Sequence, residues 1–119
     1  MTYNPENATE KPMLPNDTIF DGIIINIEDG TVSQFVEDMS KWSCPPTQPA
    51  IRTTTQVMYE GHNFEVTTIF TYENVDGKTS YSTNSKLGKF KKKYTNLPAV
   101  GTRVKVMTND NGYGLIKLN

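Results

Sequence analysis

The chain has 119 residues, 35% of them apolar and 21% charged, and a formal net charge of −1. This length suits a single domain that buries its own core, and the lone cysteine, Cys44, excludes an internal disulfide. No segment approaches the roughly twenty apolar residues of a membrane span, and the N-terminus lacks the pattern of a secretion signal. We therefore expect a soluble, cytoplasmic protein with no membrane partner.

The charge is divided between the two parts of the chain. Residues 1–76 hold three basic side chains against twelve acidic ones, a net charge of −9. Residues 77–119 hold nine basic side chains against Asp110 alone, a net charge of +8, and five of these nine lie within residues 86–93. Such a field attracts a polyanion or an acidic partner.

The first elements in chain order are an arm and a strand. Residues 1–17 are polar and contain three prolines, so we expect a flexible N-terminal arm before a single domain at residues 18–119. Residues 18–27 predict a strand. Its predicted inward face consists of Ile19, Ile23, Ile25 and Ile27. Residues 28–30 are expected to turn the chain.

A short helix and a long hairpin are predicted next. Thr31 and Gln34 match a capping box, and the apolar residues that follow predict a helix over residues 32–42. Alternating apolar and threonine residues then predict two strands over residues 50–59 and 64–72, joined by a turn.

The last elements are a basic helix and a second hairpin. Ser85 is a suitable N-cap for a helix over residues 86–95, with Leu87, Phe90 and Tyr94 on its apolar side. Lysines occupy the other side. The closing hairpin is predicted over residues 102–118, with Val104 and Val106 pointing inward.

This order of elements predicts a mainly β fold. It is a five-stranded barrel with one basic helix between the third and fourth strands and a short helix in the first loop. Over residues 18–119 the chain resembles, in architecture and element order, the OB-fold single-stranded-nucleic-acid-binding proteins, and the segment Ser85–Leu118 contributes most to that resemblance. It implies a binding surface for single-stranded DNA or RNA, with DNA favoured.

The candidate binding residues are cations that neutralise phosphates and aromatic rings that stack bases. The cations are Lys86, Lys89, Lys92, Lys93, Arg52, Arg103, Lys105 and Lys117. The rings are Trp42, Tyr59, Tyr81 and Tyr113. Two alternatives stay open: Trp42 is either a core residue or a stacking ring, and Tyr113 either faces a base or folds back onto the barrel.

Catalysis and metal binding are poorly supported. The single thiol and the single imidazole, Cys44 and His62, lie in different predicted loops without a cysteine-enzyme signature. One Cys and one His do not make a zinc site, and we expect no cofactor, no small-molecule substrate and no enzyme.

Two functions from different classes remain. The first is binding of single-stranded nucleic acid with low sequence specificity. The alternative is a protein-interaction or assembly module, whose basic end docks an acidic partner or another copy of the chain by self-association.

Overall fold

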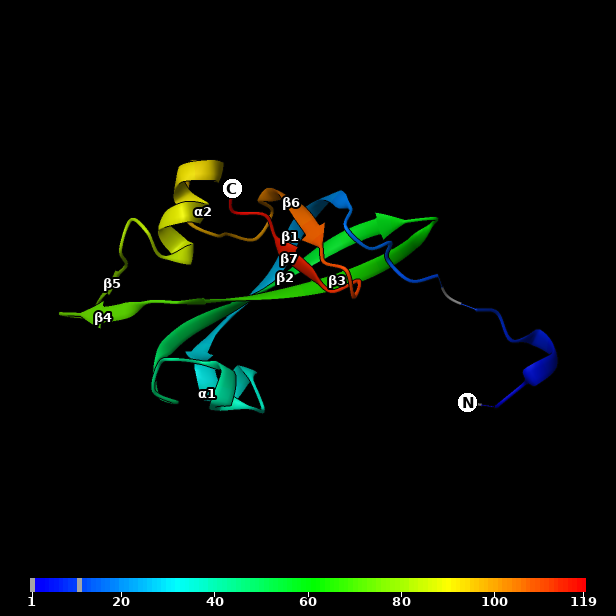
Figure 1. The fold of residues 1–119 in the computed structure, drawn as a ribbon, viewed down its shortest axis with the longest axis horizontal. Coiled ribbons are helices and arrows are strands. Elements are labelled where there is room, and N and C mark those ends of the chain that lie inside the picture. Colours follow the sequence, from blue (N-terminus) through cyan, green and yellow to red (C-terminus); the bar gives the residue numbers. More distant parts are fainter. Residues whose placement is uncertain (1, 11) are drawn as a thin grey trace.

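The computed structural model describes residues 2–10 and 12–119 and shows a mainly β protein (Figure 1). Five strands form one antiparallel sheet in the order β3-β2-β1-β6-β7, which curls into a nearly closed barrel. The strands are β1 (Ile19–Thr31), β2 (Pro49–Tyr59), β3 (His62–Thr71), β6 (Arg103–Thr108) and β7 (Gly114–Ile116). This arrangement confirms the predicted fold class and is compatible with an OB-like architecture.

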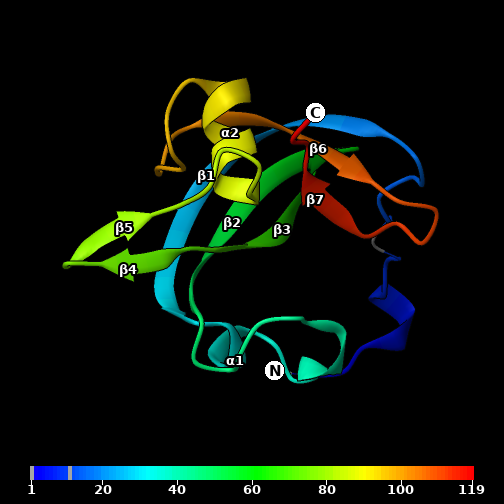
Figure 2. The ribbon, with the colours of Figure 1, turned by 60° about the vertical axis from the view of Figure 1, so that its left-hand side comes forward.

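The remaining elements are short. They are η1 (Pro5–Asn7), α1 (Val32–Phe35), η2 (Met39–Lys41), the small hairpin of β4 (Glu73–Val75) and β5 (Lys78–Ser80), and α2 (Lys86–Tyr94). In Figures 1 and 2, α2 and the C-terminal residue lie on one side of the barrel and α1 lies on the other. In the part of the chain that the structure describes, no helix is long and apolar enough to cross a membrane.

The barrel closes where β3 meets β7. These strands are the two edges of the sheet, and the backbone N–H of Ile116 donates a hydrogen bond of 3.2 Å to the side-chain oxygen of Thr68. Both residues are buried. Gly114 fits this close approach, because a Cβ atom there would lie 3.0 Å from a methyl group of Val66. A side chain thus takes part in closing the barrel.

Strand β1 turns a different face inward from the one predicted. Ile24 is fully buried, whereas Ile19 and Ile25 are 51% and 38% exposed, and Ile23 faces outward beside Ile24. A register shift between Ile24 and Asn26 marks a β-bulge. The bulge adds one residue, so Ile27 still reaches the core. The prediction was therefore right for Ile27 and wrong for Ile19, Ile23 and Ile25.

The segment after Ile27 also differs from the prediction. Residues 28–30 do not turn the chain, since they continue β1 and pair with residues 50–52 of β2. The capping box of Thr31 and Gln34 is confirmed, but the helix it starts is one turn long instead of extending over residues 32–42. Val36 already has an extended backbone conformation. The apolar residues beyond Val32 are only half-buried, so little packing stabilises a longer helix.

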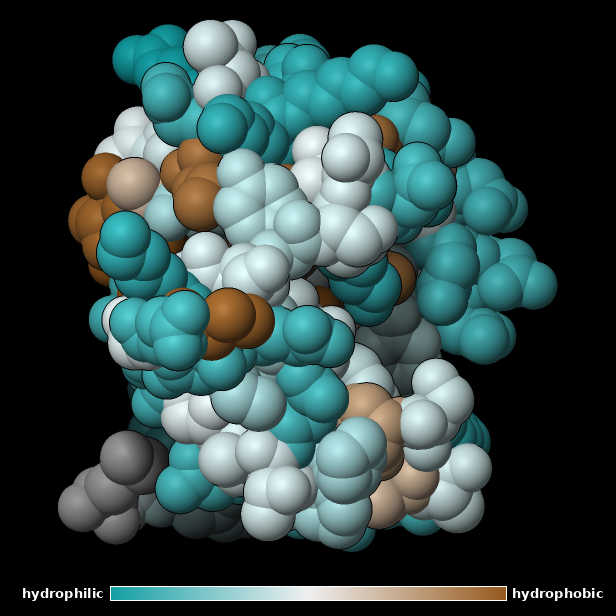
Figure 3. Space-filling view, turned by 90° about the vertical axis from the view of Figure 1, so that its left-hand side faces the viewer, coloured by the Kyte–Doolittle hydropathy of each residue, from teal (hydrophilic) through white to brown (hydrophobic). Residues whose placement is uncertain are grey.

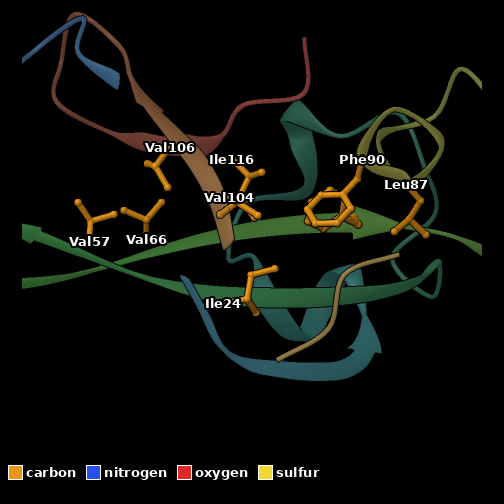
Figure 4. Close-up of a cluster of buried hydrophobic side chains, with 9 residues drawn as sticks. Ile24, Val57, Val66, Leu87, Phe90, Val104, Val106 and Ile116 are labelled. Carbon is orange, nitrogen blue, oxygen red and sulfur yellow. The ribbon is translucent and has the colours of Figure 1, made fainter. Parts of the chain in front are cut away.

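Both predicted hairpins and their inward faces are confirmed. Thr53, Thr55 and Val57 of β2 are buried, as the alternation predicted, and β6 buries Val104 and Val106. Figure 4 shows Leu87 and Phe90 of α2 beside the buried residues of the barrel strands. The Phe90 ring meets that of Phe70 edge to face, with 5.7 Å between centroids. Helix α2 is therefore fixed to the barrel by its apolar side.

Candidate nucleic-acid interface

Helix α2 presents a row of lysines to solvent. The Ser85 hydroxyl accepts a hydrogen bond of 3.2 Å from the backbone N–H of Gly88, which caps the helix as predicted. Leu87 and Phe90 are buried on one side. The lysines lie outside that side and are exposed; they are Lys86, Lys89, Lys91, Lys92 and Lys93. Figure 3 views the side that carries β4 and β5, and hydrophilic residues prevail in its upper part, where Figure 1 places α2.

The structure joins this helix to the basic residues of the closing hairpin. The Tyr94 hydroxyl accepts a hydrogen bond from the backbone N–H of Lys105 (3.1 Å) and donates one to the backbone carbonyl of Lys117 (2.7 Å). The ammonium of Lys93 donates to the backbone carbonyl of Asn119 (3.1 Å). Arg103 lies two residues before Lys105 on the outward face of β6. The C-terminal end of α2, which carries Lys91, Lys92 and Lys93, therefore lies against the hairpin that carries Lys105 and Lys117.

Two of the predicted cations are held in ion pairs among the described residues. Arg52 pairs with Glu28 over 2.7 Å, and its guanidinium lies 5.0 Å from the ring centroid of Phe35 in α1. The structure therefore places Arg52 beside α1 and does not bring it to the lysines of α2. Lys105 pairs with Asp21 on the neighbouring strand β1.

Lys86 differs from the other lysines of α2. Its ammonium lies 5.8 Å from the ring centroid of Trp42, and the surrounding protein atoms desolvate the amine and lower its pKa. Trp42 is half-buried beneath this contact. Lys86 and Trp42 thus connect α2 to the first loop, which favours a packing role for Trp42.

The predicted aromatic rings are not equally available. Tyr113 is 75% exposed in the turn between β6 and β7. Tyr59 is half-buried and meets Phe20 edge to face at 5.7 Å; desolvation and then the nearby Glu60 raise the pKa of its hydroxyl. Tyr81 is also half-buried and packs against the core. Of these three tyrosines, Tyr113 has the most accessible ring for stacking.

A groove of about 810 Å³ lies beside the basic residues, on the outside of β1, β2 and β6. We call it the basic groove. Its walls include Ile19, Asp21, Ile23, Met58, Arg103 and Lys105, and Tyr94 reaches its border. The side chains of the groove form rows across the strands. Ile23 is opposite both Gln56 and Arg103, and Asp21 is opposite Lys105.

Of the groove residues, only Arg103 and Lys105 were predicted from the sequence, and those not predicted include Asp21, Ile23, Gln56 and Met58. The sequence of β1 did contain a signal for which face points outward. Asp21 lies between Ile19 and Ile23 on one face, whereas Phe20 and Ile24 lie on the other. A charged residue within one of two apolar faces is an indication that this face is the outer one.

A second cleft, of about 450 Å³, lies between β3 and β7. We call it the Tyr113 cleft, since Tyr113 forms one wall and Met13 and Leu14 of the N-terminal arm lie beside it. Among the described residues that line it, Glu65 is charged and none is a lysine or arginine. The described linings of the two hollows therefore differ in the sign of their charge.

The single thiol and the single imidazole of the chain are far apart. Cys44 lines a small cleft with Thr71 and Tyr72 at the end of β3, whereas His62 begins β3 at the other end of the hairpin. Among the described residues, no group of three or more His, Cys, Asp or Glu side chains could hold a metal ion.

No protein-family model, curated protein or solved structure matches the chain. The function proposed below is therefore derived from the geometry and charge of this molecule.

Proposed function

We propose that this protein is an OB-fold-like module that binds single-stranded nucleic acid, with DNA favoured over RNA and with low sequence specificity. The observation that carries the proposal is the pair of hydrogen bonds between the Tyr94 hydroxyl and the backbones of Lys105 and Lys117, which attaches the C-terminal end of the lysine-rich helix α2 to the basic hairpin. Exposed cations on one surface bind phosphates irrespective of base sequence. The order of strands, with α2 between the third and fourth strands of the barrel, supports the OB-like comparison.

A duplex offers the same phosphates, so preference for a single strand needs a surface for bases. The basic groove supplies one, because the exposed side chain of Met58 lines the same groove as Arg103 and Lys105. Bases that are free of a partner strand can bury their faces on apolar or aromatic side chains, and paired bases cannot.

The test compares a labelled oligo-dT with the corresponding single-stranded RNA and with a duplex, by fluorescence anisotropy across a salt series. The double variant Lys89→Glu with Lys92→Glu should weaken binding at moderate salt by more than about tenfold, because both charges are exposed and neither forms an ion pair with another described residue. The matched control is Lys41→Glu with Lys78→Glu, which reverses two exposed lysines elsewhere and should leave affinity nearly unchanged. Wild-type protein that fails to bind the oligonucleotide at low salt would overturn the proposal.

The division of charge favours one second candidate, a head-to-tail assembly module. Glu37 and Asp38 follow α1, which Figure 2 places on the opposite side of the barrel from α2. Two copies could pair these ends. Sedimentation without nucleic acid separates the candidates, because the assembly module should associate at low salt and dissociate at high salt, whereas a monomer at all salt concentrations contradicts it.

A further inference from the structure

The basic groove and the Tyr113 cleft are alternative paths for a bound strand. In OB-fold proteins, the loop between the last two strands commonly contacts the ligand, and Tyr113 lies in the corresponding loop here. The charges indicate the other path. Arg103 and Lys105 line the basic groove, whereas the described lining of the Tyr113 cleft bears the carboxylate of Glu65 and no cation.

We propose that the single strand crosses the outer surface of β6, β1 and β2 through the basic groove and does not enter the Tyr113 cleft. This inference rests on the proposed function and specifies the binding path. The phosphates lie against Arg103 and Lys105, and the bases contact the apolar side chains of Ile23 and Met58. The lysines of α2 continue this path, since Tyr94 borders the groove and also bonds to Lys105.

The order of side chains across the strands supports this path. Arg103 of β6 is directly opposite Ile23 of β1, and Ile23 is directly opposite Gln56 of β2. Neighbouring strands are about 4.8 Å apart, so a cation, an apolar group and an amide follow one another across about 10 Å. Met58 lies two residues beyond Gln56 on the same outward face and is 60% exposed.

Asp21 is the feature of the groove that opposes binding. Its side chain is exposed and pairs with Lys105, directly opposite on β6. An incoming phosphate must displace this carboxylate from Lys105 and also experiences its repulsion. Asp21 therefore lowers affinity for the strand. If the strand follows this path, removing the charge of Asp21 should increase binding.

The experiment compares two matched neutralisations, Asp21→Asn in the basic groove and Glu65→Gln in the Tyr113 cleft, by oligo-dT anisotropy at moderate salt. Both residues are exposed, so neither change should disturb folding, and circular dichroism checks this. We expect Asp21→Asn to raise affinity by about threefold, the effect of removing one charge some 6 Å from a phosphate in water. Glu65→Gln should change affinity less, because Glu65 lies one strand beyond Gln56, about 14 Å across the strands from Arg103, where salt screens its charge.

A second pair tests the base contacts. Met58→Ala should weaken binding several-fold without changing the salt dependence, whereas Tyr113→Ala should leave affinity unchanged. The reverse pattern in either pair would overturn the groove path while leaving single-strand binding intact. An equal rise for both neutralisations would also overturn it, because affinity would then follow the overall charge. Failure of the wild-type protein to bind refutes the proposed function itself and is distinct from these outcomes.

Discussion

The Tyr94 hydroxyl replaces one of the two backbone hydrogen bonds expected at Lys105. Residues 105 and 117 continue the β6–β7 register, and in an antiparallel pair of this kind two residues exchange both N–H···O bonds. One is present, from the N–H of Lys117 to the carbonyl of Lys105 over 2.8 Å. The other is bridged by Tyr94, which accepts from Lys105 and donates to Lys117. The helix is thus attached to the sheet at its basic edge.

Tyr94→Phe should destabilise the protein by about 1–3 kcal/mol, because it leaves a backbone N–H and a carbonyl without this partner. The ring should keep its place against Phe90, at 4.7 Å between centroids. Urea denaturation measures the loss, and hydrogen exchange at the Lys105 amide should become faster than in wild type. An unchanged exchange rate would show that water replaces both hydrogen bonds of the Tyr94 hydroxyl without loss of stability.

Gly88→Ala should lower stability, although alanine is the better helix former by about 1 kcal/mol. A Cβ atom at this position would lie 2.3 Å from the carbonyl oxygen of Ser82 and 2.4 Å from that of Thr83. Relieving this overlap requires a backbone shift, which typically costs about 1–3 kcal/mol. Lys91→Ala, on the exposed side of the same helix, is the control and should be nearly neutral in thermal denaturation. A more stable Gly88→Ala protein would contradict the close packing of Gly88 against the backbone carbonyls of Ser82 and Thr83.

Local patterns predicted the parts of the site that depend on neighbours in sequence. The position of the Ser85 cap and the spacing of Leu87 and Phe90 were enough to place the lysines on the exposed side of α2. The capping box at Thr31 and Gln34 was also local, and it correctly gave the start of α1. Its end was not predictable in this way, because tertiary packing decides how long such a helix is.

The basic groove depends on features that local patterns do not contain. The face of β1 that lines the groove, with Ile19 and Ile23, is the one predicted to point inward. The true inward face, with Ile24, is offset from it by one residue, and the bulge between Ile24 and Asn26 hides that error, since Ile27 is inward in both descriptions. The pair of Asp21 and Lys105 joins residues 84 positions apart. Sequence reasoning found the cation but not the carboxylate that faces it.

The N-terminal arm should contribute to stability only through its last residues. Leu14 packs against the core, and the carbonyl of Pro15 accepts a hydrogen bond of 2.7 Å from the Thr108 hydroxyl. Removing residues 2–10 should leave the melting temperature nearly unchanged, because the side chains there are exposed. Removing residues 2–16 should lower it, in contrast to the expectation from sequence that residues 1–17 are a flexible arm outside the domain. Equal melting temperatures for the two truncations would mean that the Leu14 contact adds no stability.

Two arginines offer the final test, because one lies in the basic groove and the other is already paired. Arg103→Gln removes a cation that lines the groove, and Arg52→Gln removes one that is held by Glu28 beside α1. Each phosphate contact to a single strand contributes about 0.7 to the slope of log affinity against log salt. Arg103→Gln should therefore reduce the slope by about 0.7, and Arg52→Gln should leave it unchanged in the folded protein. Equal reductions would show that affinity responds to net charge at a distance, because Arg52 is not part of the surface that Tyr94 joins to α2.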